Sequence, residues 1–259
     1  MSDTPEALAA SLRGLEQSLA KFEGSTGRLV PDLVLLSYIL DVQEHAEAVL
    51  LLAKSPRPRA AVVNVRAAME SALEAKFLTT EPSKYLDGGS LARVHEILER
   101  VALEKSHARV PGLLAQTEPM TDAEAIVKEE AAGWDALAPG RGVLLQRALL
   151  ELSRSGRGGR THWSGKEKEE IYAMALGLDA DGNPQGPMVR VLYSMLSMEA
   201  HPRPRAGNRR LSIDETMALR IQANPQDAAR MIQGAVLACE IATAALRERA
   251  AYRDVQSGT

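Results

Sequence analysis

The sequence predicts an all-α protein, an irregular bundle of several helices with one short β-hairpin before the C-terminal helix. Aromatic residues make up only 3% of the 259 residues, so the core must be built from Leu, Ala, Val, Ile and Met, a palette that favours helices over sheets. Helix-starting residues recur along the whole chain. Between them, apolar residues repeat at intervals of three or four, which is the spacing of a helix with one buried face.

The start of each expected helix carries a capping side chain or a proline in its first turn. These residues are Thr4, Pro31, Pro58, Ser90, Thr121, Ser164, Pro187 and Pro225. Thr121 and Ser164 are each followed three residues later by glutamate, the spacing of a capping box. The helices are therefore expected at residues 5–22, 31–54, 58–79, 90–107, 121–136, 143–154, 165–177, 187–201 and 225–252.

One segment, residues 209–222, has the alternation of a strand pair instead. Apolar Leu211 and Ile213 and then Leu219 and Ile221 flank the polar run that begins at Asp214, which predicts a short hairpin. For domain organisation we expect an N-terminal helical arm at residues 1–28 and a helical bundle domain at residues 29–259.

Composition excludes several classes of protein. The single cysteine, Cys239, rules out an internal disulfide framework and a zinc site with several cysteines, and it agrees with a reducing cytosol. No uncharged apolar run reaches 18 residues, and the N-terminus lacks the pattern of a secretory signal, so we expect a cytoplasmic protein without a membrane span. The five histidines never approach one another at metal-ligand spacing. No metal or cofactor is therefore expected.

A first candidate for chemistry lies on the helix expected at 58–79. Arg66 and Glu70 are four residues apart and so share one face, which borders the apolar stripe of that helix. Such a pair can bind an anion or position an acid–base group. It can equally be a structural ion pair within the helix.

The second candidate is a polar ridge on the helix expected at 187–201. Arg190, Ser197 and His201 lie on this ridge, and Tyr193, Ser197 and His201 follow one another at intervals of four. In one interpretation His201 is a general acid or base, Ser197 or Tyr193 orients it, and Arg190 or Arg66 holds an anionic group. The basic segment 201–210, which contains Arg203 and Arg205, would bind phosphate. In the other interpretation, these side chains form hydrogen bonds inside a helix pair.

These motifs suggest a family. The Arg66-x-x-x-Glu70 helix, followed by Tyr193-x-x-x-Ser197-x-x-x-His201, resembles an uncharacterised group of bacterial all-helical proteins of unknown function. HEPN-type helical ribonucleases, whose motif is an arginine followed at a short interval by a histidine, are a more distant comparison. The pairs Arg100 with His107 and Arg157 with His162 have that spacing, but about one such match is expected by chance in this composition.

Two functions follow from these patterns. In the first, a helical protein of bacterial stress or defence acts on RNA or on a phosphate-bearing ligand, with Arg66, Glu70, Ser197 and His201 in one polar cleft. Residues 141–210 support it, because they hold 12 Lys or Arg against seven Asp or Glu. In the second, the chain is a non-enzymatic interaction module that docks a partner or forms a homodimer through exposed Leu and Ala faces. The expected partners are thus a nucleic acid, an anionic small molecule or a second copy.

Overall fold

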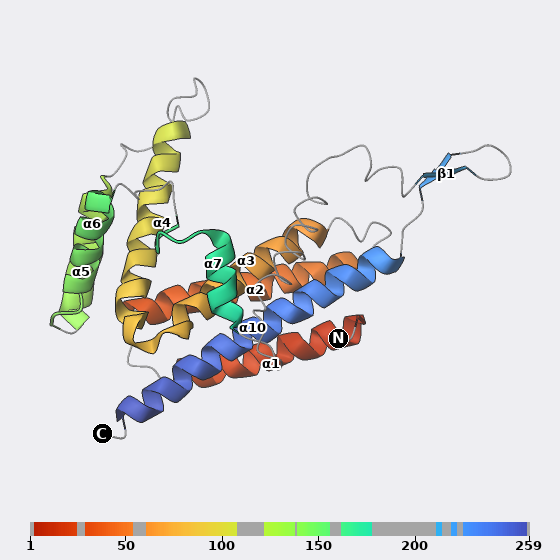
Figure 1. The fold of residues 1–259 in the computed structure, drawn as a ribbon, viewed down its shortest axis with the longest axis horizontal. Coiled ribbons are helices and arrows are strands. Elements are labelled where there is room, and N and C mark those ends of the chain that lie inside the picture. Colours follow the sequence, from red (N-terminus) through yellow and green to blue (C-terminus); the bar gives the residue numbers. More distant parts are fainter. Residues whose placement is uncertain are drawn as a thin grey trace. The chain divides into compact units, whose positions relative to one another are not determined.

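The computed structural model describes residues 3–24, 29–53, 61–107, 122–137, 139–155, 162–177, 211–213, 219–221 and 225–257. Helices occupy most of these residues, which confirms the all-α class (Figure 1). The α-helices are α1 (Pro5–Gly24), α2 (Val30–Ala53), α3 (Val62–Thr80), α4 (Tyr85–His107), α5 (Ala123–Leu137), α6 (Val143–Ser155), α7 (Lys168–Leu176) and α10 (Pro225–Ser257). A 3₁₀ turn, η2 (Pro82–Lys84), precedes α4. The helix expected at 187–201 lies outside the described residues.

Contacts divide the chain into two compact units. The first holds Met1–Thr26, Leu36–Thr80 and Glu169–Thr259, and the second holds Gly27–Leu35 and Glu81–Lys168. In the first unit, α10 packs against both α1 and α3. α3 and α10 run in the same direction, because Gly234 lies against Val65 and Glu248 lies against Thr79, each pair 169 residues apart. α10 is therefore the central helix of the described part of this unit.

Polar contacts join α3 to α10 near their C-terminal halves. Lys76 on α3 forms an ion pair with Glu248 on α10. The Thr79 hydroxyl donates a hydrogen bond to Glu248 Oε2 over 3.2 Å. Along the same interface, a Cβ added at Gly234 would lie 2.5 Å from Val65 Cγ1. Glycine at position 234 therefore allows the two helices to approach closely.

The second unit has an apolar core of its own, to which α4, α5 and α6 all contribute. Its members include Val94, Ile97, Val101, Val127, Trp134, Leu145 and Leu152. Beside this core, Arg93 on α4 forms a bidentate ion pair with Glu130 on α5. The Nε of Arg93 donates to Oε1 of Glu130 over 2.9 Å, and the Nη2 of Arg93 donates to Oε2 of Glu130 over 2.9 Å. Hydrogen bonding to Glu130 raises the pKa of Arg93 above its ordinary value. This charge-assisted pair of hydrogen bonds therefore connects α4 to α5.

The first residues of α1 and α4 show that a local capping side chain sets the start of one helix but not of the other. The Thr4 side chain accepts a hydrogen bond from the Ala7 amide over 3.3 Å, so the expected cap of α1 is confirmed. The expected start of α4 at Ser90 is wrong, because α4 begins five residues earlier at Tyr85. Ser90 lies inside the helix, where its hydroxyl donates to the Leu86 carbonyl over 2.8 Å.

Two three-residue strands precede α10. β1 (Leu211–Ile213) and β2 (Leu219–Ile221) pair antiparallel, with Leu211 opposite Ile221 and Ile213 opposite Leu219. The residues that join these strands lie outside the described part of the chain, so the complete hairpin expected at 209–222 stays a prediction. The pair is too small to change the all-α class.

Within the described ranges, one helix has the length and composition that could cross a membrane. It covers Gln226–Tyr252 of α10, and 61% of its apolar window is buried inside the structure. α10 also contacts α1 and α3, as the core helix of a soluble protein does. This is weak evidence for a span, and the expected cytoplasmic location stays a prediction.

Candidate functional site

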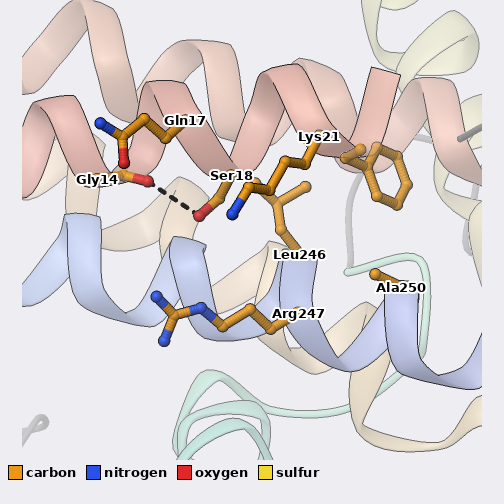
Figure 2. Close-up of a pocket in the computed structure, with 8 residues that line it drawn as sticks. Gly14, Gln17, Ser18, Lys21, Leu246, Arg247 and Ala250 are labelled. Carbon is orange, nitrogen blue, oxygen red and sulfur yellow. Dashed lines mark hydrogen bonds between the residues drawn. The ribbon is translucent and has the colours of Figure 1, made fainter. Parts of the chain in front are cut away.

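A groove lies between α1 and α10 in the first unit. It encloses about 370 Å³. Its walls come from one turn after another of α1 and from the C-terminal half of α10 (Figure 2). The lining residues are Gly14, Gln17, Ser18, Lys21, Phe22, Leu246, Arg247 and Ala250.

The groove combines an apolar base with a polar rim. Phe22 and Leu246 are buried, and Ala250 is half-buried beside them. Gln17, Lys21 and Arg247 are exposed at the rim. The Ser18 hydroxyl donates a hydrogen bond to the Gly14 carbonyl over 2.9 Å, so its oxygen still has lone pairs that can accept from a ligand. Ligands that fit must therefore have an apolar part and a polar part.

The charge of the rim is positive. Lys21 extends from α1 toward α10, and Arg247 comes from the opposite wall (Figure 2). No acidic residue lines the groove among the residues that the structure describes. Neither cation forms an ion pair with another described side chain. Two cations without a carboxylate between them attract an anion, and arginine and lysine are the side chains that bind phosphate best.

The Arg66–Glu70 pair that the sequence singles out is present on α3. Arg66 Nε lies 3.3 Å from Glu70 Oε1, and the two side chains are 28% and 35% exposed. Val65 is level with Gly234 and Thr79 is level with Glu248, so each residue of α3 lies beside the residue of α10 that is 169 positions later. Glu70 is therefore level with Cys239, which is eight residues before Arg247 on α10. At a rise of about 1.5 Å per residue, the separation along the axis is about 12 Å. The structure therefore does not bring this pair to the groove.

The other predicted site residues cannot be placed. Ser197 and His201, expected to be catalytic, lie outside the described residues. The same is true of the expected ligand-binding residues Arg190, Tyr193, Arg203 and Arg205. Their convergence with Arg66 and Glu70 in one cleft stays a prediction.

Sequence reasoning missed the groove residues Gln17, Lys21 and Arg247. Gln17 and Lys21 are four residues apart and so share a face of α1, which the sequence spacing alone could have shown. Arg247, however, is 226 residues further along the chain than Lys21. Nothing local indicates that α10 packs against α1.

No group of three or more metal-ligating side chains occurs in the described part of the chain. Histidine contacts there are local or pairwise. His45 Nδ1 lies 3.1 Å from Asn64 Oδ1, and His162 Nδ1 lies 2.6 Å from the Ser164 hydroxyl. These pairs connect neighbouring segments and offer no metal cluster.

Cys239 is fully buried in α10. Burial, with a smaller contribution from Glu240, raises the pKa of its thiol to about 12. At pH 8 the thiolate fraction should therefore be about a thousandfold below that of a free cysteine. We expect iodoacetamide to label Cys239 in the native protein at least that much more slowly than in guanidinium, as followed by mass spectrometry. Equal rates in the two conditions would contradict the buried position.

Comparison with family models, with curated proteins and with solved structures finds no match. The resemblance based on Arg66, Glu70, Tyr193, Ser197 and His201 therefore stays a prediction. What the protein binds has to be derived from the chemistry of its own residues.

Proposed function

We propose that this chain is a helical binding protein for a small phosphate-bearing ligand. The observation that carries the proposal is a pair of cations, Lys21 and Arg247, that line one groove with an apolar base and form no ion pair with a described side chain. The volume of about 370 Å³ is at the small end of ligand pockets, which span about 300–1,000 Å³. A phosphate at the rim and an apolar or aromatic group over Phe22 and Leu246 would satisfy both parts of the groove.

The choice of a small ligand over RNA has a physical reason. Binding of a single strand usually combines a long basic track with exposed aromatic rings on which bases stack. Among the described residues that line the groove, one is aromatic and two are cationic, which is too few for such a track. Action on RNA through Arg66, Glu70, Ser197 and His201 stays a separate prediction about another part of the chain.

The test compares ligands that differ only in a phosphate. Calorimetric titration with adenosine monophosphate should give binding that adenosine lacks. Because each rim contact is solvent-exposed, Lys21→Gln and Arg247→Gln should each weaken binding by about fivefold. Binding should also weaken as sodium chloride is raised to about 0.5 M, since salt screens exposed charges.

Arg13→Gln is the matched control for these variants. Arg13 is an exposed cation on α1 that does not line the groove, so its loss changes the net charge equally. Its affinity for adenosine monophosphate should equal that of the wild type. The proposal fails if adenosine binds as well as its phosphate, or if Arg13→Gln weakens binding as much as Arg247→Gln does.

We also propose that the chain is an interaction module, because large apolar side chains remain exposed on several helices. Leu51 is 74% exposed on α2, and Leu150 is 56% exposed on α6. Burying such side chains against a partner is favourable.

A further inference from the structure

The outward face of α2 is acidic and apolar. Leu40, Glu44, Glu47 and Leu51 follow at steps of four, three and four, so they form one line along the helix. All four are exposed. No Lys or Arg occurs in the helix. We refer to these four side chains as the acidic face.

The outward face of α6 has the opposite charge and the same spacing. Val143, Arg147, Leu150 and Arg154 also follow at steps of four, three and four, and all four are exposed. The opposite side of α6 is buried in the core of its own unit through Leu145, Ala148 and Leu152. Neither arginine forms an ion pair with another side chain that the structure describes. These four side chains are the basic face.

The geometry points to a second copy of this chain as the partner: we propose that the acidic face of one copy binds the basic face of another. The proposal rests on the interaction-module role above and names its partner. Two helices laid side by side antiparallel place Glu47 level with Arg147 and Leu51 level with Val143. In this register Leu40 and Leu150 are offset by one helical turn along the axis, and so are Glu44 and Arg154.

Charge complementarity is the reason to choose a second copy over an unrelated partner. Each face needs a partner of opposite charge that also carries exposed apolar groups, and the same chain supplies both faces in equal amounts. Glu44 and Glu47 also disfavour pairing of α2 with α2, because like charges would meet. In the proposed dimer both contacts form, α2 with α6 and α6 with α2, in the two-fold symmetric arrangement that is commonest among homodimers.

Charge reversal tests this pairing. Sedimentation should give a dimer mass for the wild type at concentrations of tens of micromolar, and a monomer mass for Glu44→Arg/Glu47→Arg and for Arg147→Glu/Arg154→Glu. In an equimolar mixture of the two variants, α2 and α6 again carry opposite charges at both contacts. The mixture should therefore return to the dimer mass.

Glu104→Arg/Glu240→Arg is the control, because both residues are exposed glutamates on other helices, α4 and α10, and the charge change equals that of Glu44→Arg/Glu47→Arg. It should remain dimeric, and circular dichroism should show every variant folded. A wild-type dimer that survives both reversals, or a mixture that stays monomeric, overturns the pairing of these faces and leaves the docking role standing. A wild type that is monomeric at about 100 μM overturns both. Neither result bears on binding of adenosine monophosphate in the groove.

Discussion

Gly89→Ala is expected to lower the free energy of unfolding by about 1–3 kcal/mol, the usual cost of overpacking. A Cβ at position 89 would lie 2.4 Å from Pro31 Cβ and 2.5 Å from Pro31 Cα. One of these atoms belongs to the backbone and the other to a closed ring, so neither can rotate away. The substitution can be accommodated only if α4 moves away from the start of α2.

The same movement would disturb a buried hydrogen bond. The Tyr85 hydroxyl donates to Asp32 Oδ1 over 2.9 Å, and both side chains are only 2% exposed. Tyr85 lies one turn before Gly89 on α4, and Asp32 follows Pro31 on α2. The close approach at Gly89 therefore holds the two partners in reach of each other. Tyr85→Phe should accordingly cost less in the Gly89→Ala background than in the wild type.

Urea unfolding followed by circular dichroism measures both effects. Gly133→Ala is the control, because Gly133 lies inside α5 and a Cβ there would meet nothing within 4 Å. Alanine is the better helix former, so this variant should gain about 0.5–1 kcal/mol. If Gly89→Ala also stabilises the protein, the close approach of α4 to Pro31 is not present in solution.

Local signals predicted the helices well because the chemistry of a cap acts within one turn. The Thr4 cap and the Arg66–Glu70 pair are both interactions over three or four residues, and both are present. The start of α4 shows the limit of such signals. Gly88 and Gly89 suggest that no helix has begun, yet Gly89 is a helical residue whose missing side chain allows contact with Pro31. A tertiary contact therefore overrides the low helix propensity of glycine.

The groove lay beyond prediction for a related reason. Periodicity shows which side chains share a face of one helix, but it does not show which helix covers that face. Lys21 and Arg247 share a groove because α10 packs against α1, and the packing depends on buried side chains such as Leu15 and Leu246. Equivalent apolar stripes occur on the other helices. The sequence alone therefore left the pairing of helices open.

Leu152→Ala is expected to have the largest effect on stability, a loss of about 2–5 kcal/mol. Leu152 has no exposed surface and belongs to the core that α4, α5 and α6 form. Truncation removes apolar contacts and leaves a cavity that the surrounding helices fill only in part. Urea unfolding measures the loss.

Leu103→Ala is the matched control on α4, because Leu103 is 56% exposed and the substitution is chemically the same. Its effect should stay within about 0.5 kcal/mol. Equal effects of the two variants would mean that α6 does not pack through Leu152. The outcome also bears on the basic face, since the burial of Leu145, Ala148 and Leu152 is what turns Arg147 and Leu150 outward. A folded Leu152→Ala protein should consequently dimerise more weakly, because a loosened α6 has to be ordered again before it can bind.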